Sequence, residues 1–397
     1  MNNITFCIPT KNNLRYLKSC IKSILINSTY QNKILVYIDS DNDGTEDWLK
    51  ENNISYIKNN SNIPKGIAYG YNRCIEQADT ELVCMFHADM YMGKGFDEGI
   101  LKLIKPNTVV SGTRIEPPLH PKGKEKIVEN FGMYPEDFKK NEFDEFVKNL
   151  RDLNKDKHTR GIFAPWCIYK VDIENIGMHD EMFHSYHEDS DIFNRFILKN
   201  YEIVQSWESY AYHFTCRGGQ FQDGVEKITS DENFHKMKNN AMKNFLRKWG
   251  TWIRNDEFQF PILSPRYEVG IRLKNADLDL IRLLEPWCDK LYIDNLSELA
   301  YKYNEEEQKN TKYDLKKRIF SSHLIPDTNI LIDIDKNTFA QEDFNVLQMM
   351  PDIIKDTNET GIFEISNMKV EVALLQEYQN ELIDCRLGDK DLFIPIK

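Results

Sequence analysis

The first 90 residues alternate between short apolar runs and longer stretches in which apolar side chains recur every three or four positions. The short runs have the length and composition of strands, and the periodic stretches are typical of amphipathic helices. We expect strands in NITFCIP, KILVYI, ISYIKN and ELVCMFHAD, separated by helices in LRYLKSCIKSILI, TEDWLKEN and GIAYGYNRCIEQA. This β-α-β order predicts an α/β fold with a mostly parallel sheet flanked by helices on both faces.

Further along the chain the alternation becomes less regular. Residues 116–160 are polar and rich in Pro, Gly and Lys before they turn helical and charged, which favours an insertion or lid over a core segment. A strand in GIFAPWCIYKV, a helix from HEDSD, strand-like runs in EIVQSW and SYAYHF and a helix ending at Gly250 follow. We therefore expect a first domain over residues 1–255 and a smaller C-terminal α/β domain over 256–397. No internal repeat is evident.

Composition limits the class of protein without naming its function. The chain is 41% apolar and 29% charged, which is ordinary for a soluble globular protein. Its net charge of -12 argues against broad binding of phosphate backbones, although a local basic groove stays open. The eight cysteines are scattered without zinc-site spacing, and neither a signal peptide nor a membrane-spanning run is evident. These features predict a reducing, cytoplasmic location, or the host cytoplasm for a viral protein.

Polar residues follow three of the four predicted parallel strands. They are Pro9-Thr10, the acidic turn that starts at Asp39, and His87-Ala88-Asp89. In open parallel sheets, ligands bind beyond the carboxyl ends of the strands. These positions are therefore the first candidates for a binding site.

The acidic turn DSDNDG begins like a calcium-binding EF-hand loop. Such a loop needs a bidentate acid at its twelfth position, where this chain has Lys50, and a preceding helix, where this chain predicts a strand. Two interpretations remain: the turn is a solvated helix cap with Thr45 at the helix start, or Asp39 and Asp41 bind a ligand such as a base or sugar.

A second acidic group, HEDSD, places Glu188, Asp189 and Asp191 at the start of a predicted helix. Helix-dipole interactions alone can explain acids there. The ordered series IPTKNN, the Asp39 turn, FHAD and HEDSDIFNRF is harder to explain in this way. Together with the Asn/Gly-rich passage before FHAD and the turn GMHDEMF, this series resembles the family 2 glycosyltransferases of GT-A fold over roughly residues 1 to 250.

The resemblance implies roles for individual residues. It assigns donor binding to Pro9, Thr10 and Asp39, with Ala88 inside the motif that corresponds to D-x-D. It assigns a divalent metal to Asp89 and to His213, which follows a later strand. It assigns the catalytic base to the Glu188-Asp189 pair, which is followed by Arg195. Asp189 is the preferred base, and Asp191 is its alternative.

One departure concerns the metal. The first acid of D-x-D is His87 here, and imidazole suits Mn²⁺ better than Mg²⁺. His87 is therefore a third candidate ligand, although it could equally contact phosphate or cap the strand. Lys11 and Arg73 are weaker candidates for phosphate contacts, because a lone basic residue is more often a solvated charge. Arg217 is a somewhat better one, because it follows His213 on a Gly-containing loop.

Taken together, these features predict a metal-dependent glycosyltransferase that uses a nucleotide-sugar, with a UDP-sugar first. It is expected to invert the anomeric carbon, although retention stays open, and to transfer a hexose or a pentose. The acceptor is a glycan, with protein or modified nucleic acid as alternatives, and an oligomer is compatible with the sequence. The competing hypotheses are a nucleotidyltransferase, which would normally carry a Gly-rich loop after the first strand, and a non-catalytic glycan-binding relative.

Overall fold

The computed structural model describes residues 3–215, 232–294, 296–379 and 394–395, and the chain divides into two compact units. The N-terminal unit contains Met1–His235 and Asn255–Ile262, and the C-terminal unit contains Lys236–Arg254 and Leu263–Lys397. The expected boundary at residue 255/256 therefore differs from the structural division, because the helix that ends at Trp249 belongs mainly with the C-terminal unit.

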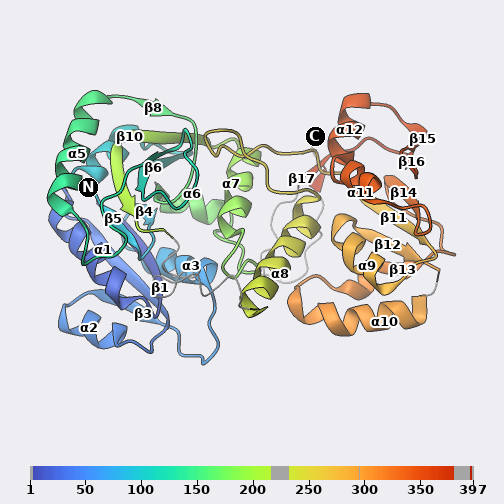
Figure 1. Ribbon diagram of the computed structural model, residues 1–397, viewed down its shortest axis with the longest axis horizontal. Helices are drawn as coiled ribbons and strands as arrows, with labels where there is room; N and C mark the ends of the chain where they lie inside the picture. The colour runs from blue at the N-terminus through green and yellow to red at the C-terminus, as the bar shows by residue number, and fades with distance from the viewer. Residues whose placement is uncertain (1–2, 216–231, 295, 380–393, 396–397) are drawn as a thin grey trace. The chain divides into compact units, whose positions relative to one another are not determined.

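The N-terminal unit begins with the predicted alternation of strands and helices (Figure 1). Its elements are β1 (Ile4–Lys11), α1 (Leu14–Asn27), β2 (Lys33–Ser40), α2 (Thr45–Glu51), β3 (Ser55–Lys58), α3 (Ile67–Gln77), β4 (Leu82–Met85), β5 (Met90–Met92), α4 (Phe96–Leu103), β6 (Thr108–Glu116), β7 (Lys126–Val128), α5 (Lys140–Leu153), β8 (His158–Thr159), β9 (Trp166–Tyr169), α6 (Lys170–Asn175), α7 (Glu188–Leu198) and β10 (Glu202–His213).

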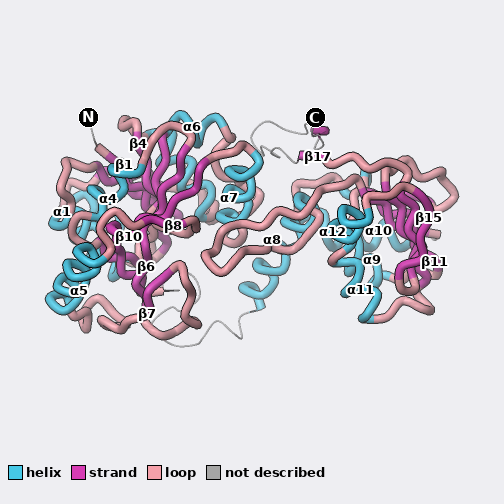
Figure 2. Tube along the Cα trace, turned by 90° about the horizontal axis from the view of Figure 1, so that it is seen from above, coloured by secondary structure: helices cyan, strands magenta, loops and turns pink. Residues whose placement is uncertain are grey.

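These strands form one sheet in the order β3-β2-β1-β4-β9-β6-β10-β5, with β7 beside β6 and β8 beside β10. Strands β1 to β4 pair in parallel, as do β6 and β10, whereas β9 and β5 run antiparallel to their neighbours. The predicted mostly parallel sheet flanked by helices is confirmed (Figure 2). Strands β1 and β4 at its centre are buried almost throughout, which explains why they read as continuous apolar runs.

Segment 116–160 is more firmly packed than the expected lid. Phe131, Phe143 and Val147 are buried in an apolar cluster with Tyr210 and Tyr212 of β10. The amphipathic pattern of α5 provides this contact, since Phe143 and Val147 lie one helical turn apart. The polar, Lys-rich composition of residues 116–126 had concealed a segment that covers part of the sheet.

The C-terminal unit contains a second, six-stranded sheet. Its elements are most of α8 (Glu232–Trp249), β11 (Val269–Lys274), α9 (Leu278–Leu284), β12 (Lys290–Ile293), α10 (Leu296–Glu307), β13 (Ile319–Ser321), β14 (Ile330–Asp335), α11 (Gln341–Gln348), α12 (Met350–Thr357), β15 (Gly361–Ile365) and β16 (Met368–Val372), with three short 3-10 helices (Glu285–Trp287, Gln308–Asn310 and Leu315–Lys317). A two-stranded pair, β17 (Tyr378–Gln379) and β18 (Ile394–Pro395), also occurs. The predicted smaller α/β domain is confirmed.

Helix α8 joins the C-terminal unit through a buried ion network. Leu246 lies in the apolar core of that unit, and the guanidinium of Arg247 contacts Glu285 at 2.6 Å and Glu307 at 2.8 Å. All of these groups are buried.

No helix among the described residues combines the length and apolar character needed to cross a bilayer. The six cysteines in the described part of the chain are buried and free.

Candidate active site

Three potential metal ligands meet at the carboxyl edge of the large sheet. One donor atom from each of His87, Asp89 and His213 lies within 4.8 Å of the others, and His213 Nε2 is 3.5 Å from Asp89 Oδ1. Strand pairing explains the meeting: β5 and β10 pair His213 with Met90, the residue after Asp89. The structure thus brings together the three residues that the sequence proposed as metal ligands.

His213 is oriented by a carboxylate that the sequence did not single out. Its Nδ1 lies 3.0 Å from Glu116 Oε1, and the other carboxylate oxygen of Glu116 accepts a 2.9 Å hydrogen bond from Lys126. Glu116 ends β6, which pairs in parallel with β10. When Nδ1–H donates to Glu116, Nε2 is left to face Asp89. A carboxylate behind a histidine is the usual outer support of a metal ligand.

The electrostatic surroundings of the two histidines differ. Burial and, to a smaller extent, the neighbouring His213 lower the pKa of His87 to about 4. Burial also acts to lower the pKa of His213, but Asp89 and Glu116 outweigh it and raise that pKa to about 9. An imidazole between two carboxylates carries positive charge in the metal-free protein, so a bound cation replaces a proton at this position.

The donor set fits a divalent transition metal. It offers two imidazole nitrogens and one carboxylate oxygen, which is a softer set than the all-oxygen shell that Mg²⁺ prefers. Glu116 supplies the supporting contact. Asp89 and His213 are both buried, so the site is sheltered from bulk water.

The acidic turn after β2 is a capping structure. Asp41 accepts hydrogen bonds from the backbone N–H groups of Thr45 and Glu46 at the start of α2. Asp43 accepts from the backbone N–H of Leu14 at the start of α1. These contacts account for both acids as helix caps. Asp41 therefore has a structural role, and its contact with the donor stays a prediction.

Asp39 is buried at the end of β2 and organises the loop before α3. Its carboxylate accepts from the backbone N–H groups of Lys65 at 2.7 Å and Gly66 at 3.1 Å, and from the Asn59 side chain at 3.2 Å. Gly66 has φ +87, and a Cβ there would lie 1.9 Å from the carbonyl oxygen of His184. The loop is thus fixed on both sides, with Asp39 at its centre.

Glu188 and Asp189 begin helix α7, and their carboxyl groups have different surroundings. Burial and the adjacent Asp189 raise the pKa of Glu188 to about 8, so Glu188 keeps its proton at neutral pH. Its Oε2 is buried without a hydrogen-bond partner among the described residues. Asp189 is half-buried and accepts from the backbone N–H of Ser190 at 2.6 Å. Two neighbouring carboxyls in unlike environments are a frequent arrangement at sites of proton transfer.

Asp191, the alternative base, is occupied elsewhere. It is fully buried, and its Oδ2 lies 3.0 Å from Nε and 2.9 Å from an Nη of Arg195. Arg195 also donates to the backbone carbonyl of Ile176. The pair fastens α7 to the segment before it, which gives Asp191 a structural role, and Asp189 stays the first candidate for the base.

Arg114 is a further residue at this site that the sequence did not reveal. It lies on β6, is 4% exposed, and contacts Glu116 and Glu125, each at 3.2 Å. Its guanidinium carbon lies 3.6 Å from the ring centroid of Phe163. Nη1 has no hydrogen-bond partner within the described residues, and Asp189 is close enough to interact with its charge. The signal in the sequence was the alternation of two charges, Arg114 and Glu116, on one face of a buried strand.

The remaining donor-binding candidates fall into four groups. Thr10 and Ala88 are buried at the carboxyl edge, and the Thr10 hydroxyl has no partner in the part of the chain that the structure describes. Pro9 packs against α3, where a Cβ on Gly70 would lie 2.9 Å from the Pro9 Cβ. Arg73 pairs with Glu76 at 2.6 Å and lies over the Tyr69 ring. Arg217 lies outside the described residues.

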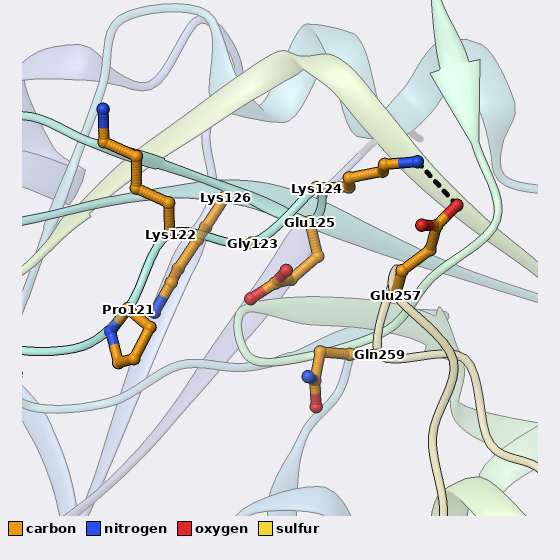
Figure 3. Close-up of a pocket in the computed structure, with 8 residues that line it drawn as sticks. All are labelled: Pro121, Lys122, Gly123, Lys124, Glu125, Lys126, Glu257 and Gln259. Atoms are coloured by element: carbon orange, nitrogen blue, oxygen red, sulfur yellow. Dashed lines mark ion pairs between the residues drawn. The ribbon is translucent and has the colours of Figure 1, made fainter.

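A cavity of about 660 Å³ lies beside the segment that carries Lys126. It is lined by Pro121, Lys122, Gly123, Lys124, Glu125, Lys126, Glu257 and Gln259 (Figure 3). In Figure 3 the ammonium group of Lys124 reaches toward Glu257, with which it forms a 2.7 Å ion pair. Lys126 connects the cavity to the cluster through its bond to Glu116.

Comparison with curated proteins finds no match. Among solved structures, S. aureus TarS 1-349 aligns with a TM-score of 0.35 and 11% identity, covering 54% of this chain and 58% of that chain. The same protein fragment in complex with UDP-GlcNAc gives 0.39 and 14%, covering 60% and 64%, and S. aureus TarS gives 0.39 and 15%, covering 54% and 36%. This chain thus spans less than two thirds of each of these structures.

The sequence profile of the family described as "Glycosyl transferase family 2" matches residues 5–173. This range contains β1 to β9, including the Asp39 turn and His87-Ala88-Asp89. The match therefore lies within the N-terminal unit and includes the strand ends that carry its candidate residues.

Proposed function

We propose that this chain is a metal-dependent glycosyltransferase that moves a sugar from a nucleotide-sugar, a UDP-sugar first, to an acceptor hydroxyl group. One observation carries the proposal. His87, Asp89 and His213 converge at the carboxyl edge of the sheet that contains the family 2 match, where parallel sheets bind their ligands.

The proposed cation is held by Asp89, His213 and His87, and Mn²⁺ suits this donor set better than Mg²⁺. When bound, such a cation acts as a Lewis acid that offsets negative charge on the departing diphosphate. Glu116 is a positioning residue, because it fixes the ring of His213 through Nδ1. Asp39 is the proposed partner of the nucleotide base, held in place by the N–H groups of the loop before α3.

Asp189 is the proposed general base, which takes the proton from the attacking hydroxyl group. Its neighbour Glu188 keeps its own proton at neutral pH, so the pair carries one negative charge instead of two. Arg114 supplies a buried positive charge close to Asp189 and between two further carboxylates. A single base and a single displacement predict inversion of the anomeric carbon.

The acceptor is proposed to be a glycan, with protein and modified nucleic acid as alternatives, and the sugar is a hexose or a pentose. The cavity between residues 121–126 and Gln259 is large enough for one or two sugar rings, and its Lys126 bonds to Glu116, the residue behind His213. It is therefore the first place to look for bound acceptor.

The test uses the full chain with a panel of nucleotide-sugars and Mn²⁺, and measures release of free nucleotide diphosphate. We expect release from one donor class, its loss with EDTA, and a fall of about 100-fold or more in Asp189→Asn, which is the usual contribution of a general base. Asp89→Asn should abolish the response to Mn²⁺. Asp47→Asn is the matched control, since Asp47 is exposed on α2.

Each outcome addresses a separate part of the proposal. Turnover that ignores EDTA contradicts the metal role of Asp89 and His213. Full activity in Asp189→Asn contradicts the base assignment. Binding of nucleotide-sugar without any turnover, with or without glycan acceptors, would favour the non-catalytic relative.

A further inference from the structure

The sheet of the C-terminal unit repeats the strand order of the nucleotide-binding half of the N-terminal unit. In the N-terminal unit, β3-β2-β1-β4 are parallel neighbours, and the antiparallel strand β9 follows β4. In the C-terminal unit, β13-β12-β11-β14 are parallel neighbours, and the antiparallel strand β16 follows β14. The order along the chain is also the same. The first strand lies in the middle, the second and third add on one side of it, and the fourth adds on its other side (Figure 1).

The first strands of the two sheets end alike. β1 and the residue after it read Ile8-Pro-Thr-Lys-Asn12, and β11 with its next residue reads Ile271-Arg-Leu-Lys-Asn275. Both asparagines have left-handed backbone angles, with φ 49 and φ 55, and a helix begins within three residues of each. We therefore equate residues 7–12 with residues 270–275.

The pairing register of each first strand with its neighbour then aligns β2 with β12, residue by residue. Cys7 pairs with Leu35 and Gly270 pairs with Lys290. Counting outward, the triplet Tyr37-Ile38-Asp39 corresponds to Tyr292-Ile293-Asp294, which has the same sequence. The acid at the end of the second strand is thus present in both units.

The fourth strands match in the same way. Cys7 pairs with Met85 and Gly270 pairs with Leu331. The segment His87-Ala88-Asp89 therefore corresponds to Asp333-Ile334-Asp335. The C-terminal unit carries a complete D-x-D sequence at the position where the N-terminal unit has its proposed metal ligands.

We propose that the C-terminal unit is an internal repeat of the nucleotide-binding half of the N-terminal unit, and that its copy of the site is closed to nucleotide and divalent metal. The proposal rests on the proposed function for what the first copy binds. No repeat was evident in the sequence, because only short strand ends agree and the connecting helices differ.

In the second copy, the two acids of the D-x-D sequence are held by side chains of β11 and of the residue that follows it. Both carboxylate oxygens of Asp333 are held by Arg272 at 2.7 Å, and Arg272 stands where the first copy has Pro9, which has no charge. Asp335 accepts from the Asn275 side chain at 2.9 Å and lies 3.5 Å from Lys274. These cross-strand pairs lie between β11 and β14, the crevice in which a parallel sheet of this order binds its ligand.

Two parts of the first site have no counterpart in the second. The loop of residues 322–329 joins β13 to β14 without a helix, whereas α3 brings the N–H groups that hold Asp39. Asp294 is accordingly exposed, whereas Asp39 is 7% exposed. The third proposed ligand, His213, comes from β10, and the six strands of the second sheet include no equivalent strand. Within the described residues, the only cluster of metal-ligand type is the one at His87.

The test counts binding sites on the full chain. Mn²⁺ binding is measured by electron paramagnetic resonance, and UDP binding by calorimetry in the presence of Mn²⁺, for wild type, Asp89→Asn and Asp335→Asn. We expect one Mn²⁺ and one UDP per chain. Asp89→Asn should weaken Mn²⁺ binding by about 100-fold or more. Loss of an outer-shell contact already costs up to about 100-fold, and Asp89 is a proposed direct ligand. Asp335→Asn and a second variant, Asp294→Asn, should bind like wild type.

A second saturable site in wild type would overturn the closed repeat, and so would binding that survives Asp89→Asn but disappears in Asp335→Asn. A wild-type chain that binds neither Mn²⁺ nor UDP would contradict the proposed function while agreeing with a closed second copy. Far-UV circular dichroism of each variant confirms that a loss of binding is not a loss of fold.

Discussion

Replacing Glu188 with glutamine should stabilise the N-terminal unit above about pH 5, and increasingly so toward pH 8. Burial and the adjacent Asp189 raise the pKa of Glu188 from an ordinary 4.5 to about 8. Between these values the unfolded chain has released a proton that the folded chain retains. The free energy of unfolding of the wild type therefore falls as pH rises through this window. None of this loss has occurred below about pH 4.5, and all of it has occurred above about pH 8.

The size of the effect follows from the width of the window. Each pH unit between the two pKa values corresponds to about 1.4 kcal/mol, so the whole window sets an upper limit of about 5 kcal/mol. Glu188 is half-buried, and water that reaches it screens part of this cost. We expect a gain of about 2 kcal/mol at pH 8 for Glu188→Gln and almost none at pH 4.5.

Urea unfolding at pH 4.5, 6, 7 and 8 measures this gain. Trp166 packs against Phe193 and Phe196 of α7 with ring centroids 5.9 and 5.6 Å apart, so tryptophan fluorescence reports on this region. Glu51→Gln is the control, because Glu51 is exposed at the end of α2. Parallel pH profiles of wild type and Glu188→Gln, or a variant that is less stable at pH 8, would refute the assignment of a buried, protonated Glu188.

Two further predictions concern groups with charged partners. Glu116→Gln should weaken Mn²⁺ binding by about 10- to 100-fold without abolishing it, because it removes the carboxylate behind His213 but none of the proposed ligands; an unchanged Mn²⁺ titration would contradict this. Arg247→Leu should destabilise the C-terminal unit by about 3 kcal/mol, because it removes one of the cations that hold the buried carboxylate of Glu285. Urea transitions should show this loss, with UDP binding retained at low urea; a chain as stable as wild type would show that the network is dispensable.

The sequence predicted the first sheet well because its information is local. The strands that end at Asp39 and before His87 are buried on both faces and read as apolar runs, so their ends were recognisable. His213 ends β10, which the sequence analysis predicted as two separate strand-like runs, EIVQSW and SYAYHF. The meeting of His213 with Asp89, however, depends on the antiparallel pairing of β5 with β10, which the hydrophobic pattern does not specify. That contact came only from the family resemblance.

Other features depended on contacts that no local pattern encodes. Arg114 and Glu116 lie on β6, a strand that the sequence analysis did not predict, and their importance follows from the loop that returns with Glu125 and Lys126. Helix α8 followed the first domain in sequence, but the partners of Arg247 come from the C-terminal unit. In each case a charged side chain found its partner on another segment of the chain, beyond the reach of helix or strand periodicity.

The two copies of the triplet Tyr-Ile-Asp show why a motif alone does not define a site. In the first copy, the loop before α3 supplies two backbone N–H groups to Asp39, and the carboxylate is buried. In the second copy the chain passes directly from β13 to β14, and Asp294 faces solvent, where it accepts from the backbone N–H of Asn275. The same three residues at the same register therefore have different chemistry, since the crossover after the third strand determines whether the acid is enclosed. A binding site in this fold depends on that crossover as much as on the acid itself.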